Sequence, residues 1–294
     1  MHLLAAQPGG FVDDEGIIDL DQSPAPLVLL SAADSGLAAL AAAVEQLPDT
    51  FTEVRLANWM QLLKPAAFDL YQHKVLDHAQ VVVVSMLGGR NYWAYGFEQL
   101  VAWQQARPNR TLIMVPGDDT PDAELFVHSS VSIADAQRVW HYLRESGAHN
   151  TRQLFEFLSV EYLSCEGDWR EPQRVPRCMM YLPRLSNVET FEAPQRSPQA
   201  TYKEWCQRYP VNEIHPQPVC VLLFYRSHLQ SANTQMFDGL IEALAAQGLR
   251  PLPIAVASLK DSESMALVNA LIEQSNAQLL INTTGFSCNR VSSP

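Results

Sequence analysis

Short, wholly apolar runs recur along this chain, and segments with helical spacing separate them. Residues 81–84 are four consecutive valines, and residues 27–31 read LVLLS. Apolar runs without polar alternation are typical of parallel strands that are buried on both faces of a sheet. Between these two runs, leucine and valine recur every three or four positions from 37 to 47. An alternation of buried strands with amphipathic helices predicts an α/β fold.

The pattern continues over residues 27–132 and predicts one domain there. Further strands are expected at 54–57 and 111–115, and a helix is expected at 95–105. Strands and helices alternate in this way, with right-handed crossovers, in doubly wound sheets. We therefore predict a doubly wound, flavodoxin-like N-terminal domain, preceded by an acidic segment at 1–26.

The middle of the chain has a different character. From 133 to about 163 the spacing of apolar residues is helical, whereas residues 171–218 hold eight of the nineteen prolines. Proline prevents long helices and is excluded from most central strands. We predict an irregular, proline-rich connector over residues 133–218.

A second α/β domain is expected over residues 219–294. Its predicted strands are 219–225, 252–256 and 279–282. No helical pattern follows the last of these strands, so we expect the domain to be incomplete and its apolar edge to be exposed. The expected fold is thus a flavodoxin-like domain, a connector and a truncated second α/β domain.

Charge and cysteine content exclude several classes of protein. The net charge is 20 − 32 = −12, which a nucleic-acid backbone would repel, so no nucleic-acid partner is expected. Residues 1–50 hold eight acidic residues and no Lys or Arg, which is typical of a solvated segment or of a docking face for a basic partner. Five cysteines without a Cys-x-x-Cys pair indicate reduced thiols and a cytoplasmic location. No apolar run is long enough to predict a membrane span.

Polar residues follow two predicted strands of the second domain. Arg226, Ser227 and His228 come directly after the strand at 219–225, and Asn233 and Thr234 begin the next helix. Ligands of open α/β sheets bind at the carboxyl ends of strands, where these side chains would converge. Arginine suits a carboxylate, and histidine can ligate a metal or move a proton. The alternative is that Arg226 and His228 only satisfy backbone carbonyls of the loop.

Two further loops carry candidate ligand-binding residues. Asn282 ends the strand at 279–282 and Thr283 follows it, so both would line the same edge or merely close their own turn. After the valine strand come Gly88, Gly89, Arg90, Tyr92 and Trp93. The glycines allow close backbone approach, and the other three side chains suit a flat or anionic group. The alternative is a tight turn whose aromatic side chains pack elsewhere in the protein.

Motifs of several other enzyme classes are absent from the sequence. There is no Gly-x-Gly-x-x-Gly, no Gly-Lys-Ser/Thr and no Gly-x-Ser-x-Gly, so the sequence supports no dinucleotide, phosphate-loop or serine-hydrolase site. The eight histidines show no metal-ligand spacing, and we expect no metal site formed by them. The sequence assigns no catalytic residue.

Four segments together resemble the large subunit of aerobic cobaltochelatase, which is related to the porphyrin-binding subunit of magnesium chelatase. They are LGGRNYWAYG at 87–96, FYRSHL at 224–229 with Asn-Thr at 233–234, LPI at 252–254 with SLKD at 258–261, and NTTGF at 282–286. Their order and spacing match the family from the first strand to the C-terminus. Ala232 is a departure from the family pattern, because many relatives have glycine there.

The resemblance implies a specific function. Large subunits of this family bind the corrin precursor hydrogenobyrinic acid a,c-diamide and take up Co²⁺ as a substrate during cobalamin biosynthesis. Two partner subunits form an ATPase motor that uses ATP and Mg²⁺, and the complex acts as a ligase that forms metal–nitrogen bonds. Family members are several times longer than this chain. The resemblance therefore implies an N-terminal portion of such a subunit, which we expect to be inactive alone.

Two alternatives remain open at this point. One is the large subunit of magnesium chelatase itself, although the loop at 92–93 and the segment from 252 to 261 look more like the cobalt branch. The other is a non-catalytic module in which two α/β lobes bind a small anionic ligand. No signal sequence precedes the first strand, which argues against a secreted binding protein.

Overall fold

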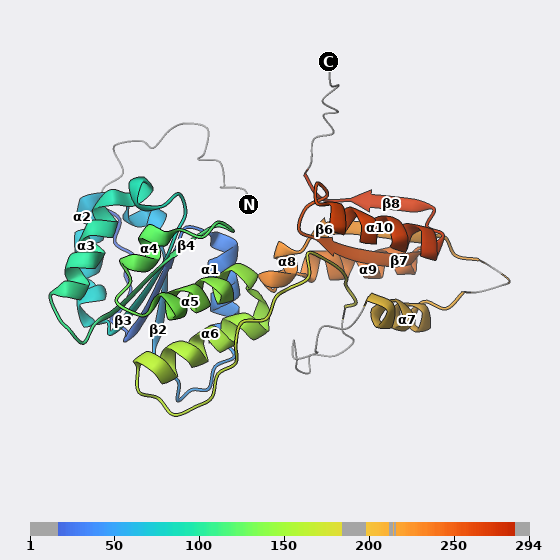
Figure 1. Ribbon diagram of the computed structural model, residues 1–294. Helices are drawn as coiled ribbons and strands as arrows, with labels where there is room; N and C mark the ends of the chain where they lie inside the picture. The colour runs from blue at the N-terminus through green and yellow to red at the C-terminus, as the bar shows by residue number, and fades with distance from the viewer. Residues whose placement is uncertain (1–16, 184–197, 212–213, 215, 286–294) are drawn as a thin grey trace, which may run out of the picture. The chain divides into compact units, whose positions relative to one another are not determined.

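The computed structural model describes residues 17–183, 198–211, 214 and 216–285 (Figure 1). The chain divides into two compact units, Met1–Arg174 and Val175–Pro294. Each unit contains one four-stranded sheet with helices against it. The expected mixed α/β architecture is therefore confirmed, and the units are described in turn.

The first sheet is wholly parallel and has the strand order β2-β1-β3-β4. This order is that of a doubly wound sheet in which the chain moves first to one side of β1 and then to the other. The strands are β1 (Leu27–Ser31), β2 (Val54–Asn58), β3 (Val81–Met86) and β4 (Thr111–Pro116).

Burial on both faces explains the valine run. Val82 and Val84 lie in one apolar core, whereas Val81 and Val83 lie in the other. Side chains alternate along a strand, so a strand covered on both sides needs apolar residues at every position. The first core is covered by α2 (Pro65–Lys74), α3 (Ala94–Gln105) and the short helices η1 (Trp59–Leu62), η2 (Leu76–His78) and η3 (Arg90–Trp93). The second core is covered by α1 (Asp34–Val44), α5 (Ile133–Glu145) and α6 (Gly147–Tyr162), and α4 (Ala123–Val127) contributes to both.

The segment 133–218 is not the single connector that we expected. Its helices α5 and α6 belong to the first unit, where Val139, Leu154 and Phe157 are fully buried in the core against the sheet. Its later part joins the second unit through β5 (Cys178–Met180) and α7 (Pro198–Arg208). Amphipathic helices bury their apolar stripe against the nearest open sheet face, and this burial decides the membership of α5 and α6. Residues 184–197 of the predicted connector lie outside the described residues.

The second sheet has the order β5-β7-β6-β8, and β5 runs antiparallel to its neighbour. The strands after β5 are β6 (Val219–Tyr225), β7 (Arg250–Val256) and β8 (Leu279–Asn282). Helices α7 and α10 (Ser262–Ser275) contribute to the core on one face, and α8 (Ser227–Gln230) and α9 (Gln235–Ala246) contribute to the core on the other. The sheet thus contains one strand more than the three that the sequence predicted.

Strand β7 contains Pro251 and Pro253. It tolerates them because the amides that they lack would point to the same side of the strand as their carbonyl oxygens, toward β5 and not toward β6. The carbonyl oxygen of Pro253 accepts the last bond of the β5 ladder, from the Tyr181 amide at 2.9 Å. Beyond it, the carbonyl of Pro251 accepts a bond from Trp205 Nε1 at 2.7 Å. Proline cannot donate to a ladder, so the pairing of β5 with β7 ends here and a tryptophan side chain replaces it.

Strand β8 forms the other edge of this sheet. Its Leu279 and Leu280 side chains are 46% and 56% exposed. Consecutive residues of a strand point to opposite faces, so neither face of β8 is fully covered by the described residues. No helix among the described residues has the length and apolar character needed to cross a membrane.

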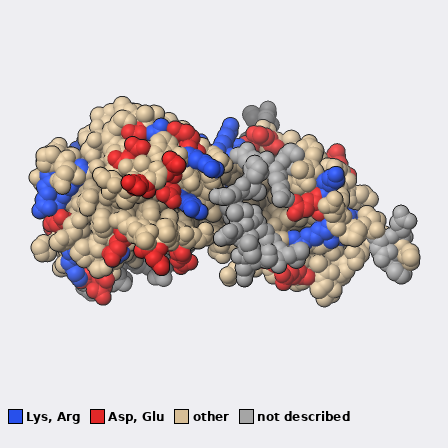
Figure 2. Space-filling model, turned by 90° about the horizontal axis from the view of Figure 1, so that it is seen from below, with Lys and Arg blue, Asp and Glu red and all other residues tan. Residues whose placement is uncertain are grey.

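The acidic N-terminal segment is only partly described, because residues 1–16 lie outside the described ranges. Of its later acids, Asp19 forms an ion pair with Lys74 at 2.6 Å. Beyond this segment, Asp34 at the start of α1 accepts a hydrogen bond from Asn58 at 2.8 Å. On the face of the molecule in Figure 2, acidic and basic side chains lie interspersed on each unit.

A glycine in α3 provides a test of the packing of the first unit. A Cβ atom at Gly96 would lie 2.1 Å from the ring carbon Cε2 of the buried Trp93. We expect Gly96→Ala to lower the free energy of unfolding by about 2 kcal/mol or more, because the tryptophan ring has no room to move. Chemical denaturation followed by circular dichroism measures this change.

The matched control is Gly239→Ala in α9, where no atom lies within 4 Å of the added Cβ. That substitution should raise stability by about 0.5 kcal/mol through helix propensity. Equal effects of the two substitutions would contradict the packing described for Trp93.

Candidate functional site

The loop after β3 begins with two glycines in the left-handed region. Gly88 and Gly89 have φ angles of +81° and +69°. A Cβ at Gly89 would lie 3.2 Å from Oδ2 of Asp122, so the backbone and this carboxylate approach each other closely. Glycine is favoured at both positions because other residues rarely adopt such angles. The loop follows the carboxyl end of the strand, as the sequence predicted, and then enters the short helix η3, which the sequence did not predict.

A hollow of about 280 Å³ lies between this loop and the loop after β4. Its walls include Gly88, Gly89, Asp118, Thr120 and Asp122. Asp118 Oδ1 accepts a bond from the Thr120 amide at 2.9 Å, and Asp122 Oδ1 accepts one from the amide of Glu124 at 2.9 Å. These bonds fix both carboxylates, so the polar wall of the hollow is acidic and suits groups that donate hydrogen bonds.

The sequence analysis missed this wall. Asp118 and Asp122 follow the predicted strand at 111–115, at the same sheet edge as the glycine pair. The rule that ligands bind at the carboxyl ends of strands applied to this loop too. The two aspartates after this strand were therefore the sequence signal for the wall.

Arg90 is held by carboxylates of its own unit. Its guanidinium lies 3.4 Å from Glu98 Oε1 and 3.3 Å from Glu124 Oε1. It also lies 5.1 Å from the centre of the Phe97 ring. These contacts orient the loop against α3 and α4, and they occupy part of the hydrogen-bonding fork that the sequence analysis assigned to a ligand.

The two aromatic residues of the loop have different environments. Trp93 is buried and stacks on Trp59 with ring centres 5.0 Å apart. Tyr92 is 49% exposed and places its ring edge-on to Trp59 at 6.0 Å. Trp93 is therefore part of the core, which is the alternative left open above, and Tyr92 is the aromatic side chain of this pair that is accessible to a ligand.

In the second unit, Arg226 contacts backbone carbonyls. Its Nη1 donates to the carbonyl oxygens of Val175 at 2.8 Å and of Pro176 at 3.2 Å. This arrangement matches the alternative in which the arginine satisfies backbone groups. Ser227, the first residue of α8, is exposed.

His228 lies partly buried against the first turn of α9. Its ring is 4.8 Å from that of Phe237, in an edge-on arrangement. Burial lowers the pKa of the His228 imidazole from its ordinary value. The ring is therefore neutral at pH 7 and has one nitrogen that can accept a proton.

Asn233 and Thr234 precede α9 and have different surroundings. Asn233 is exposed, and its backbone amide donates to the carbonyl of His228. Thr234 occupies the N-cap position, but its hydroxyl donates to Asp238 Oδ2 at 3.0 Å instead of capping the helix. Tyr181 donates to the other oxygen of Asp238 at 2.7 Å.

Asn282 and Thr283 close their own turn. Asn282 Oδ1 accepts bonds from the amide and the hydroxyl of Thr284, at 2.9 and 2.7 Å. The amide and hydroxyl of Thr283 both donate to the carbonyl of Leu223, at 2.9 and 2.8 Å. These contacts fasten the end of β8 to β6, and Asn282 itself is exposed.

No cluster of three or more His, Cys, Asp or Glu side chains with metal-binding geometry occurs among the described residues. What the described loops do share is their position. In each unit they leave the carboxyl ends of parallel strands, where the backbone presents glycines, short helices and small polar side chains. Fold and loops together define an α/β protein, and the rule for open α/β sheets makes these edges its candidate ligand sites.

Comparison with known sequences identifies the family of this chain. A model of the CobN/magnesium chelatase family matches residues 140–293, which is more than half of the chain. The chain therefore belongs to this family, and the resemblance inferred from its loops is confirmed.

Individual relatives are similar over the whole chain. It is 46% identical over 294 residues to the aerobic cobaltochelatase subunit CobN of Pseudomonas aeruginosa, and 34% identical over 299 residues to that of a Sinorhizobium species. All of this chain is covered in both cases, but only 22% of each relative. A solved catalytic subunit of cobaltochelatase from Mycobacterium tuberculosis is 25% identical, with a TM-score of 0.61 over 88% of this chain and 18% of that one. The chain thus spans about a fifth of the length of these relatives.

The loop before α9 contains a testable source of strain. Ala232 has a φ angle of +54°, which is unfavourable for a residue with a Cβ. We expect Ala232→Gly to raise the free energy of unfolding by about 0.5 kcal/mol, because relief of this strain exceeds the added entropy of the unfolded chain. Thermal or urea unfolding measures the difference.

The control is Ala243→Gly at an exposed position within α9. Glycine there should lower stability by about 1 kcal/mol through helix propensity. If both substitutions destabilised the protein equally, Ala232 would not have the left-handed conformation described here.

Proposed function

We propose that this chain forms a corrin-binding part of the large subunit of an ATP-dependent cobaltochelatase. The complex inserts Co²⁺ into hydrogenobyrinic acid a,c-diamide during aerobic cobalamin biosynthesis. One observation carries the proposal: 46% identity over all 294 residues to an aerobic cobaltochelatase subunit CobN. Identity at this level over a whole chain supports a shared role more strongly than does a shared fold.

The chemistry of the ligand fits the loops of each unit. A corrin precursor is a flat apolar ring whose rim carries carboxylates and carboxamides. In the first unit, the exposed ring of Tyr92 and the backbone at Gly88 and Gly89 offer a surface for the ring or its rim. Asp118 and Asp122 offer acceptors for carboxamide N–H groups.

In the second unit, the exposed Ser227 and Asn233 offer hydrogen-bond donors to rim carboxylates. The neutral imidazole of His228 offers an acceptor for a proton, which metal insertion must remove from the ring. Arg226 has the role of a positioning residue, because it already binds backbone carbonyls. We assign no catalytic residue. Of the residues that the sequence analysis named, we propose that Gly88, Gly89, Tyr92, Ser227, His228 and Asn233 contact the corrin. The others support these loops through contacts within the protein: Arg90, Trp93, Arg226, Thr234, Asn282 and Thr283.

The remaining parts of the reaction require partners. Co²⁺ is the substrate, and two ATPase-motor subunits supply ATP hydrolysis with Mg²⁺. This chain has no Gly-Lys-Ser/Thr sequence with which to bind nucleotide phosphates itself. We propose that it acts in the cytoplasm as part of this ligase complex and does not insert cobalt alone.

Tryptophan fluorescence tests the proposal. Trp59 lies beside Tyr92, so a metal-free corrin bound at this loop should quench the emission of the chain. We expect saturable quenching by hydrogenobyrinic acid a,c-diamide and about a tenfold weaker affinity in Tyr92→Ala, because an exposed aromatic contact is lost. Absence of saturable quenching in the wild-type chain would overturn the proposal.

The matched control is Ile133→Ala, which truncates a side chain that is 52% exposed on α5, outside these loops. Its affinity should equal that of the wild type. A parallel titration with protoporphyrin distinguishes the two branches of the family. Tighter binding of the porphyrin than of the corrin would favour the magnesium-chelatase alternative.

A further inference from the structure

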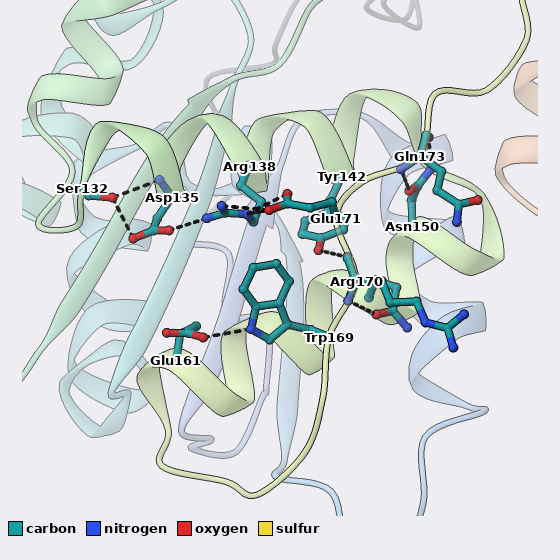
Figure 3. A network of polar contacts seen from close by, with 11 residues as sticks. Ser132, Asp135, Arg138, Tyr142, Asn150, Glu161, Trp169, Arg170, Glu171 and Gln173 are labelled. Atoms are coloured by element: carbon teal, nitrogen blue, oxygen red, sulfur yellow. Dashed lines mark hydrogen bonds and ion pairs between the residues drawn. The ribbon is translucent and has the colours of Figure 1, made fainter.

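Hydrogen-bond networks hold irregular segments of the chain in both units. In the first unit, Figure 3 shows a network that fastens residues 169–173 to α5 and α6. Its buried Asn150, for example, bonds both backbone groups of Gln173 at 2.8 Å. None of the residues labelled in that figure is among the corrin-contacting residues named above. A network in the second unit does reach those residues, and its central group is the carboxylate of Asp238.

The two oxygen atoms of Asp238 accept hydrogen bonds from two different parts of the second unit. Oδ1 accepts a bond from the hydroxyl of Tyr181 at 2.7 Å, and Oδ2 accepts one from the hydroxyl of Thr234 at 3.0 Å. Tyr181 directly follows β5, and its amide donates to the carbonyl of Pro253 in β7. Thr234 ends the loop that joins α8 to α9. The carboxylate therefore ties the end of this loop to the sheet through charge-assisted bonds.

A series of aromatic rings connects the same network to His228. The ring of Tyr181 lies edge-on to that of Phe224, with ring centres 5.9 Å apart, and Phe224 stacks on Phe237 at 4.2 Å. Both phenylalanines are buried. The imidazole of His228 rests on Phe237 at 4.8 Å. Because Phe237 and Asp238 are neighbours in the first turn of α9, the bonds that hold the carboxylate also hold the ring that supports the imidazole.

The loop between α8 and α9 needs such support. Ala232 has its φ angle in the left-handed region, which is unfavourable for a residue with a Cβ. A strained backbone persists only where surrounding contacts compensate for its cost. The amide of Asn233 provides one contact, to the carbonyl of His228 at 2.9 Å. The hydroxyl of Thr234 provides another, because it binds Asp238 and does not cap α9.

We propose that Asp238 is a positioning residue, which holds residues 227–234 in the conformation that presents Ser227, His228 and Asn233 to the corrin. It acts on the end of the loop through Thr234 and on the imidazole through α9. This role rests on the proposed function for the identity of the ligand. The placement of the imidazole does not depend on a ligand, so it is tested without one.

Removal of the Asp238 carboxylate separates positioning from charge. Burial lowers the pKa of the His228 imidazole. In Asp238→Ala the ring should lose its fixed contact with Phe237 and become more hydrated, so its pKa should rise toward the ordinary value. Loss of an anion alone would lower the pKa, because an anion favours the protonated imidazole. NMR titration of the ligand-free chain measures the shift, and the His228 signals are identified by their loss in His228→Gln.

Two control variants separate this effect from changes in charge and in stability. Glu242→Ala removes an exposed carboxylate one turn later on α9, and it should not raise the pKa of His228. Asn150→Ala breaks the anchor of Gln173 in the first unit. It should lower the urea concentration at the midpoint of unfolding but leave the pKa of His228 unchanged.

A pair of substitutions at Thr234 tests the hydrogen bond itself. Thr234→Ser keeps the hydroxyl that donates to Asp238, so the pKa of His228 should match that of the wild type. Thr234→Val has the same shape without the donor, and it should raise the pKa as Asp238→Ala does. Equal pKa values in the serine and valine variants would contradict the path through Thr234.

The corrin titration described above completes the test. We expect about fivefold weaker affinity in Asp238→Ala, because a loosened loop must be ordered on binding, and unchanged affinity in Glu242→Ala. Absence of binding to the wild type would overturn the proposed function, whereas the NMR titration would still show whether Asp238 places the imidazole. A pKa of His228 in Asp238→Ala at or below the wild-type value would overturn the positioning role. Unchanged corrin affinity in that variant would overturn it as well.

Discussion

The architecture depends on the burial of β3 on both faces. Val81 and Val83 belong to one core and Val82 and Val84 to the other, so a single strand links the two layers of helices. Its parallel pairing with β1 and β4 is in register, which brings the carboxyl ends of these strands to one edge of the sheet. The glycine loop and the acidic hollow lie at that edge because the register places them there.

Local sequence patterns predicted those parts of the fold that burial on both faces determines. The buried strands at 27–31 and 219–225 have the expected bounds, and the glycine loop lies where it was expected. The strand at 279–282 also has its expected bounds, although it is exposed. The membership of α5 and α6 was not predictable in this way, because it depends on which sheet face remains open in three dimensions. The extension of β7 back to Arg250 was missed, because a strand with prolines at 251 and 253 contradicts the general rule until Trp205 is seen to satisfy the freed carbonyl.

The candidate site likewise has one part that the sequence predicted and one part that depends on the three-dimensional fold. The positions of the loops followed from topology, but the partners of their side chains did not. Arg90 and Arg226 were expected to bind a ligand, whereas Glu98, Glu124 and the carbonyls of Val175 and Pro176 bind them within the protein. All of these partners except Glu98 are distant in sequence, and no spacing rule identifies them. An arginine at a loop is as well suited to hold the loop as to hold a ligand, and only its surroundings decide between the two.

The two edges of the second sheet differ in their capacity to template a further strand. On one side, β5 is three residues long, and prolines interrupt the adjoining ladder. A short edge bounded by residues without amide hydrogens is a poor template for intermolecular pairing. On the other side, β8 carries neither charge nor proline, and its leucines are exposed. Among the described residues, β8 is therefore the edge of this sheet that has the unpaired backbone and apolar surface on which a further strand can pair.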